Sequence, residues 1–448
     1  MKKTIVIFAS LALLSQSVWA ENLILASDPI LAAAKHVADK EVPAQLSLSL
    51  SEAQDYAIDN NRSLRNADLA VQKAYAQRWQ TIASMLPQLD MSWGFQSMMG
   101  YEMLLGGMPI KMNDNGTLSV TASVGINGQA VVGALLNNIA IDMQRLSLQQ
   151  SEDNLRANVK TSYVSVLVLE DVVKLLDASL KNLEELVAIT QSSVDAGMAE
   201  QTAADQIVVR VNTLKNNINA NKRSTQLAIN ALKVLLNIPV DTELTLTSKL
   251  DDMLSAEAIL QLLGKDFVLE NNLNYQTLEK NVELAKTNVH MAGWAYGPTV
   301  ALAYQYSDKS YFGKSEGLNM TPPNALSLSL SMPLWSSGKR AAGVVEKKIA
   351  LEEARNLFAE TTDNLAIQNE QLRYNLQNGY DTYVTEKENM RVTQQIFEST
   401  SQKYDQGVAS KLDLINASND LISAQSTYVQ AVLTLVNAQV ELEKFLNL

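Results

Sequence analysis

The chain has 448 residues and is 47% hydrophobic, which is enough apolar side chain for a folded core and argues against a disordered protein. Its formal net charge of −12 argues against nucleic acid as a partner, because neutralising phosphates requires a surplus of lysine and arginine. The absence of cysteine excludes disulfides, thiolate metal sites and a lipidated cysteine at a mature N-terminus.

Residues 1–20 have the pattern of a secretory signal peptide. Two lysines precede an apolar run from Ile5 to Leu14, and a cleavage site follows Ala20. Residues 21–45 contain two prolines and no sustained period, so we expect a leader of irregular structure. No later window holds about 18 consecutive apolar residues, so any membrane-spanning part should consist of strands.

The next segment, 46–240, changes its hydrophobic period twice. Helical spacing ends at Pro87 and is interrupted at Asn60-Asn61, a period of two follows, and the helical period then returns. The predicted elements are a helix over 51–85, a β-hairpin over 88–126 with a glycine-rich loop, and long helices over 135–237 that turn at Gly197.

The same order of elements recurs over 261–448, after a connector without strong period over 241–260. Asn271-Asn272 and Pro298 stand where Asn60-Asn61 and Pro87 stood in the first half. The predicted elements are a helix, a β-hairpin over 298–335, and long helices over 342–446 that turn at Gly407. We interpret the chain as a tandem duplication.

Each predicted strand has one apolar face and one face of Ser, Thr, Ala, Gly and Gln. This alternation is typical of a transmembrane barrel, although a half-buried hairpin on a soluble core gives the same pattern in any single strand. Two equivalent hairpins together with a signal peptide favour the barrel. The residues predicted to face lipid are Leu89, Met91, Trp93, Phe95, Val120, Val124, Leu302, Tyr304, Tyr306, Leu328 and Leu330.

Four strands per chain cannot close a barrel, because an open edge in lipid leaves backbone groups without hydrogen bonds. About eight strands give an interior filled by side chains, so a twelve-stranded homotrimer is the smallest assembly that conducts. The last helix supports an assembly, since its heptad row from Leu414 to Leu442 is widened by a second apolar stripe and so requires neighbours on both sides. The predicted fold class is mainly α with a small transmembrane β part.

The sequence resembles the TolC family of outer membrane efflux proteins over about 46–448. The segments that carry the resemblance are Glu270-Asn271-Asn272, SMPLWSSGKR at 331–340 and, above all, YDQGVASKLDLINA at 404–417. The resemblance implies a homotrimer with a β-barrel in the outer membrane of a Gram-negative bacterium and a long α-barrel in the periplasm. It further implies the exit duct of a tripartite efflux pump or type I secretion system, with a periplasmic adaptor as direct partner and an inner-membrane transporter as indirect partner.

The resemblance also suggests a pore constriction at Asp413 and Asn416. TolC itself has two aspartates three residues apart on this helix; here Asp413 matches the first and Asn416 occupies the second. Three copies of Asp413 around an axis would form an acidic ring that selects cations. The other interpretation is that Asp413 caps the first turn of its helix, where an acidic residue is favoured.

The two turns after the long helices are the candidate docking tips. Glycine is the expected residue after a helix C-terminus, but the apolar residues after each glycine would form an exposed patch for an adaptor. The predicted tip residues are Gly197, Met198, Ala199, Gly407, Val408 and Ala409; familiar TolC members have arginine at the position of Ala409.

No catalytic or metal motif is present, so we expect neither an enzyme nor a cofactor. His290 has no second histidine or cysteine at ligand spacing, and a packed or solvated histidine is the simpler interpretation. The competing function from another class is a soluble periplasmic coiled-coil adaptor or structural protein. The transported substrate cannot be identified from a channel lined by small polar side chains.

Overall fold

The structure, a computed structural model, describes residues 44–111, 113–198, 200–312 and 322–447. The predicted signal peptide, almost all of the predicted leader and Ala199 lie outside these ranges. The described residues form two compact units, each of which takes segments from both halves of the sequence. The sheet unit contains 69–145 and 277–359, and the helical unit contains 44–68, 146–276 and 360–447.

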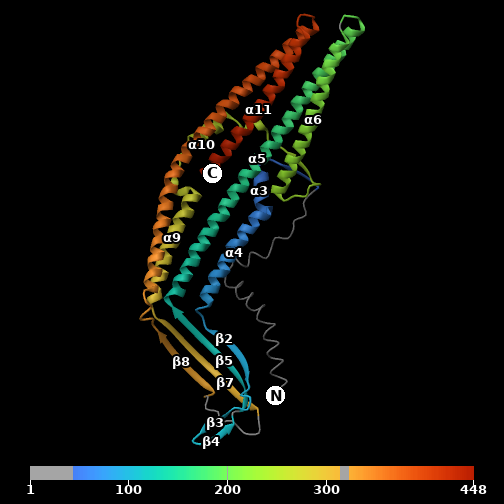
Figure 1. Cartoon of the computed structure of the whole chain (residues 1–448). Coiled ribbons are helices and arrows are strands. Elements are labelled where there is room, and N and C mark those ends of the chain that lie inside the picture. The colour runs from blue at the N-terminus through green and yellow to red at the C-terminus, as the bar shows by residue number, and fades with distance from the viewer. Residues whose placement is uncertain (1–43, 112, 199, 313–321, 448) are drawn as a thin grey trace. The chain divides into compact units, whose positions relative to one another are not determined.

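The sheet unit is built around one antiparallel four-stranded sheet (Figure 1). Its strand order is β2 (Gln88–Gln96), β5 (Asp114–Asn127), β7 (Thr299–Phe312) and β8 (Asn324–Ser331). The two predicted hairpins are therefore joined through β5 and β7 into a single sheet. A further small hairpin, β3 (Glu102–Leu105) and β4 (Met108–Lys111), lies in the predicted glycine-rich loop.

The register of this sheet gives it two chemically different faces. Met91 lies opposite Val120, which in turn lies opposite Tyr306, so these side chains point to the same face. By the same pairing, every residue predicted to face lipid lies on that one face, and Ser, Thr, Gly and Gln predominate on the other. The apolar face is uncovered in the single chain, with Leu328 75% and Trp93 66% exposed.

Long helices make up most of the remaining chain (Figure 1). Their bounds are α3 Leu50–Asn60, α4 Arg62–Ala83, α5 Gly128–Asp195, α6 Gln201–Leu236, α9 Leu273–Gly293, α10 Lys339–Asp405 and α11 Lys411–Phe445. Along the described part of the chain, no helix is both long enough and apolar enough to cross a membrane. Helix α5 begins before the predicted position 135, because Asn127 at the end of β5 accepts a hydrogen bond from the backbone N–H of Ala130 at 2.7 Å and starts the helix directly.

The predicted connector over 241–260, which has no strong period in the sequence, contains short elements. They are β6 (Glu243–Leu246), α7 (Leu250–Met253) and the start of α8 (Ala256–Leu263). Strand β6 pairs in parallel with β1 (Gln45–Leu48) at the end of the predicted leader. Each strand has only four residues, too short for a period to be read from the sequence.

In each half of the chain, an asparagine at the equivalent position bonds the start of one helix to the end of another. The side chain of Asn61 accepts hydrogen bonds from the first turn of α4 and donates one to the carbonyl of Leu235, at the end of α6, at 2.8 Å. Asn272 does the same for α9 and donates to the carbonyl of Phe445, at the end of α11, at 3.0 Å. The predicted helix break at Asn60-Asn61 is thus confirmed, and its cause is this capping side chain.

Tyr163 on α5 anchors the small parallel sheet. Its ring is fully buried, and its hydroxyl donates to the carbonyl of Leu48 at 2.9 Å. The same oxygen accepts hydrogen bonds from the backbone N–H groups of Thr247 and Ser248, both at 3.1 Å. One side chain therefore bonds to three backbone groups, one in the last residue of β1 and two just beyond the end of β6.

Replacing Tyr163 with Phe should lower the free energy of unfolding by about 1–3 kcal/mol, because the backbone N–H of Ser248 loses its partner and Leu48 and Thr247 lose one hydrogen bond each. The measurement is chemical or thermal unfolding of the detergent-purified protein. Tyr374→Phe is the matched control, since Tyr374 is 65% exposed. Equal midpoints for the two variants would show that the hydroxyl of Tyr163 contributes nothing to stability.

Candidate functional site

The turns between α5 and α6 and between α10 and α11 have the same backbone design. Gly197 and Gly407 are both left-handed, with φ of 74° and 71°. Their N–H groups bond to the carbonyls of Val194 and Tyr404, both at 2.9 Å. The next N–H in each turn reaches one residue further back, to Ser193 or Lys403. This double hydrogen-bond pattern ends a helix most easily on glycine.

Each glycine is followed by an apolar side chain that has almost nothing to pack against. Met198 is 79% exposed and Val408 is 75% exposed in the single chain. Ala409 is half-buried, and Ala199 is not among the described residues. Figure 1 shows both turns at the same end of the helical unit. The two turns therefore present matching apolar residues at one end of long helices.

Asp413 caps the helix that follows the second turn. Its carboxylate accepts from the backbone N–H of Ser410 at 2.9 Å and from the Ser410 hydroxyl at 2.6 Å, while its own N–H donates to that hydroxyl oxygen at 3.2 Å. This is a capping box. The hydrogen bonds from the Ser410 hydroxyl and backbone hold the pKa of the Asp413 carboxyl below its ordinary value. Asp413 therefore caps α11, which was one of the two interpretations from the sequence, and its side chain is exposed.

Asn416 lies close to Asp413, one turn further along α11. Both side chains are exposed, whereas Leu414 and Ala417 on the other side of the same turn are buried. Asp413 and Asn416 therefore belong to a polar edge at the start of α11.

The two helical pairs pack against each other next to the turns. Leu183 of α5, Ile207 of α6, Phe397 of α10 and Leu414 of α11 belong to one buried apolar cluster. A hydrogen bond of 3.2 Å between the hydroxyls of Thr190 and Tyr404 also joins α5 to α10. Opening this end of the helical unit would require breaking that bond and separating part of the cluster.

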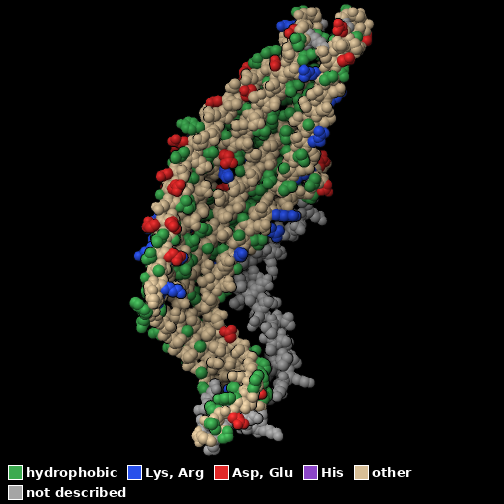
Figure 2. All heavy atoms as spheres, in the orientation of Figure 1, with side chains coloured by type: hydrophobic (Ala, Val, Ile, Leu, Met, Phe, Trp, Pro, Cys, Tyr) green, Lys and Arg blue, Asp and Glu red, His purple; other side chains and the backbone are tan. Residues whose placement is uncertain are grey.

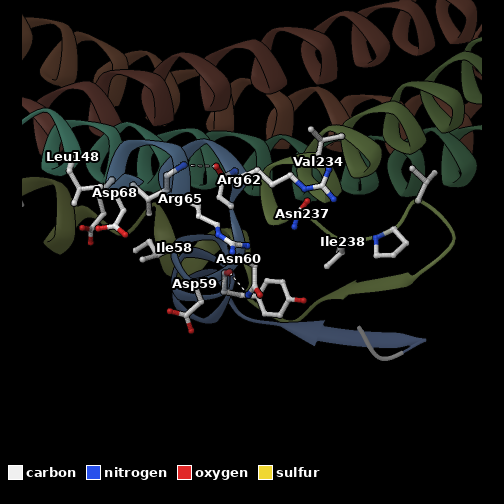
Figure 3. A pocket seen from close by; sticks show the side chains of 16 residues that line it. Ile58, Asp59, Asn60, Arg62, Arg65, Asp68, Leu148, Val234, Asn237 and Ile238 are labelled. Atoms are coloured by element: carbon white, nitrogen blue, oxygen red, sulfur yellow. Dashed lines mark hydrogen bonds between the residues drawn. The ribbon is translucent and has the colours of Figure 1, made fainter. Parts of the chain in front are cut away.

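A surface hollow of about 780 Å³ lies elsewhere in the helical unit, beside the junction of α3 and α4 (Figure 3). Asp59, Asp68, Arg62 and Arg65 surround it, and all four side chains are exposed. No serine, cysteine or histidine is among the residues that line it. The lining offers no nucleophile of these types, and its charges face solvent.

Carboxylates do not gather into a metal site in the described part of the chain. No group of three or more His, Cys, Asp or Glu side chains could hold an ion among those residues. On the face shown in Figure 2, acidic side chains are spread along the helices. The two turns thus remain the candidate functional feature of the helical unit.

Comparison with known proteins identifies the chain. The family model for outer membrane efflux proteins matches residues 54–237 and 266–448. The chain belongs to the outer membrane efflux protein family. The two matched segments each contain one of the turns described above.

Among curated relatives, the solvent efflux pump outer membrane protein SrpC of Pseudomonas putida is 25% identical over 425 residues, covering 88% of this chain and 84% of SrpC. The cation efflux system protein CusC of Escherichia coli O157:H7 is 23% identical over 417 residues, covering 86% and 82%. The crystal structure of VceC from Vibrio cholerae is similar in fold, with a TM-score of 0.69, 16% identity and coverage of 89% of this chain and 96% of VceC.

Membership of this efflux protein family decides between the two functions left open by the sequence. The protein is an outer membrane efflux channel and not an enzyme, and the soluble adaptor is not favoured. It resides in the outer membrane of a Gram-negative bacterium, with its helical part in the periplasm.

Sequence reasoning missed Ser410, Tyr404 and Thr190. The spacing Ser410-x-x-Asp413 is a capping-box signal and could have been recognised. The contact between Tyr404 and Thr190 joins residues far apart in the chain, so no local sequence pattern predicts it.

The capping box should make the start of α11 sensitive to acid. Because the folded-state pKa of Asp413 lies below the unfolded value, its stabilising effect is present above about pH 4 and is lost as the pH falls through the lowered pKa. Amide hydrogen exchange in the first turn of α11, corrected for intrinsic rates, should therefore lose protection as the pH falls below about 4, and Ser410→Ala, which removes the hydroxyl but keeps the backbone N–H donor, should weaken this dependence.

The first turn of α6 is the internal control, since its N-cap Glu200 makes no side-chain capping bond. If the α6 and α11 turns lose protection to the same extent, acid acts through general unfolding and not through Asp413.

Proposed function

We propose that this efflux channel works as a homotrimer in which each chain contributes one third of a closed barrel. The observation that carries the proposal is the pair of edge strands, β2 and β8, each hydrogen-bonded on one side only among the described strands. An open edge leaves backbone N–H and C=O groups unsatisfied in lipid, so β8 of one copy pairs with β2 of the next. The uniform apolar face formed by the eleven predicted residues then faces lipid.

Three copies give twelve strands, enough to leave a water-filled lumen, whereas two would give an interior filled by side chains. The alternate residues, such as Ser119, Thr121 and Ser329, line this lumen. Such a duct has no energy source of its own, so the energy for export comes from partner proteins.

The partner in direct contact is a periplasmic adaptor that docks on the helical turns. Met198 and Val408 supply the apolar contacts, and glycine at 197 and 407 fixes the geometry that exposes them. An inner-membrane transporter joins through the adaptor to complete a tripartite pump. The same duct serves a type I secretion system when the partners belong to one. The names of the relatives refer to solvents and to cations, so we assign the chain to the exit duct and not to one cargo.

The resting channel narrows at the start of α11. In a trimer three copies of Asp413 and Asn416 come toward the axis, and the Asp413 carboxylates repel anions. The hydrogen bond between Thr190 and Tyr404 holds this end closed by tying α10 to α5.

Replacing Met198 and Val408 together by Asp should weaken adaptor binding about tenfold or more, because an unpaired charge enters an apolar contact. The measurement is cross-linking to a purified periplasmic adaptor that binds the wild-type channel, with the trimer checked by size. Asn212→Asp with Asn216→Asp adds the same charge on the exposed side of α6 and should leave cross-linking unchanged. Undiminished cross-linking of the tip variant would reject the docking surface.

Removing the Asp413 carboxylate should enlarge the resting pore and reduce its preference for cations. Single-channel conductance of reconstituted trimers measures both, comparing wild type with Asp413→Ala. Because Asp413 also caps α11, Ser410→Ala is the matched control: it breaks the capping box and keeps the carboxylate. Conductance that changes equally in both variants would assign the effect to the cap and remove Asp413 from the constriction.

A further inference from the structure

The four places where strands pass into helices share an unusual charge pattern. These junctions are the segments 83–87, 128–141, 291–298 and 332–345, which lie at one end of the sheet within the sheet unit (Figure 1). They contain no Asp or Glu, and their only charged residues are Lys339 and Arg340. Asp90, three residues into β2, belongs to the polar face of the sheet. A chain with a net charge of −12 is therefore locally positive where its strands end.

The apolar face of the sheet continues to this end without a polar border. Its last row across the strands is Ile126, Val300 and Leu330, all exposed and none aromatic. Trp93 lies in a row near the opposite end. Transmembrane barrels have an apolar band flanked by aromatic residues at both interfaces with water. The aromatic border at the helical end must therefore come from residues outside the strands.

Trp294 occupies the position of that border. Position 128 follows Ile126 by two residues, so a side chain there would continue the apolar face. Residue 128 is glycine, and the ring of Trp294 fills the space that its β-carbon would need. The same ring also lies against Gly297, and Trp294 remains 49% exposed. The indole thus forms the next row of the apolar face beyond the end of β5.

The spacing of the two tryptophans fits a membrane. Leu118 lies opposite Trp93 on the neighbouring strand, and Gly128, which carries the Trp294 ring, comes ten residues later. Ten residues of strand are about 34 Å long, and a strand tilted by about 40° spans about 26 Å along the barrel axis. This agrees with the height of about 25 Å that is typical of the apolar band of such barrels.

The positive charges lie beside this aromatic border. The guanidinium carbon of Arg340 is 5.0 Å from the centre of the Tyr296 ring, and Tyr296 belongs to the same short helix, η2 (Trp294–Tyr296), as Trp294. Lys339 is exposed. Neither cation forms an ion pair with another residue in the described part of the chain. A guanidinium stacked on a ring keeps its N–H groups available for phosphate oxygens.

We propose that these junctions form a headgroup collar that binds phospholipids of the periplasmic leaflet. Trp294 is the interface anchor, because an indole suits the region between acyl chains and headgroups. Lys339 and Arg340 bind the lipid phosphates. The inference rests on the lipid-facing sheet of the proposed function, and it extends the membrane contact beyond the strands to the first residues of the helices.

The test measures the depth of single tryptophans in trimers reconstituted into phosphatidylcholine bilayers. Three variants keep Trp294, Trp93 or Trp79 as the single tryptophan, with the others replaced by Phe. The lipid carries a quenching spin label on its acyl chain, either next to the headgroup or near the bilayer centre. We expect the shallow label to quench Trp294 and Trp93 about twofold more strongly than the deep label. Trp79, on α4 beyond the collar, should be quenched by neither.

The charge contact is tested in the variant that keeps Trp294 alone. Shallow-labelled phosphatidylglycerol should quench it about twofold more strongly than shallow-labelled phosphatidylcholine, because the two cations enrich anionic lipid beside the ring. Lys339→Gln with Arg340→Gln should remove this preference. Lys347→Gln with Lys348→Gln is the matched control: it removes the same charge about 12 Å further along α10 and should keep the preference.

The outcomes separate the collar from the barrel. Shallow quenching of Trp93 without quenching of Trp294 overturns the collar and leaves the barrel intact. Equal quenching of Trp294 by the two lipids, or a preference that survives Lys339→Gln with Arg340→Gln, overturns the assignment of the two cations. Failure of the lipid labels to quench either Trp93 or Trp294 contradicts the barrel itself.

Discussion

The unpaired backbone groups on the outer sides of β2 and β8 constrain everything else in this protein. Lipid offers these groups no hydrogen bonds, so a four-stranded sheet can enter a membrane only when other copies complete it. Closure around an axis gives the sheet an inside and an outside, and the alternation of Val120, Val124 and their neighbours with small polar residues matches that division. In the proposed trimer, the helices of each chain are arranged around the same axis.

Polar contacts in the helical unit keep very long helices in register. Asn61 and Asn272 tie the beginning of one helix to the end of another, so that α6 and α11 finish at defined points. Tyr163 fixes the backbone around β1 and β6 in the same region. These polar anchors act on helix ends, while Leu183, Phe397 and Leu414 supply apolar packing near the turns. The turns are therefore held at a defined length from the anchors.

The sequence was sufficient wherever a pattern is local. Alternation placed Trp93, Tyr304 and Leu328 on one face, and glycine predicted both turns, because strand period and left-handed backbone are properties of neighbouring residues. It was insufficient where contacts join distant residues. Four-residue strands such as β1 and β6 have no readable period, and Tyr163 looks like any other aromatic residue of a long helix. The capping role of Asp413 was open from sequence, and whether it also lines a pore depends on other copies of the chain.

A second heptad row of α11, from Ser418 to Gln439, shows how packing varies along a helix that looks uniform in sequence. Ser418, Gln425, Val432 and Gln439 recur every seven residues and are all buried, but three of them are polar. Gln439 has a partner in Glu443, and Gln425 has none for its oxygen. Apolar residues at all four positions would bind α11 to its neighbours as one continuous seam. The polar positions thin the seam between the cluster around Leu435 and the cluster around Leu421, and Val172 of α5, which packs against both clusters, keeps them connected.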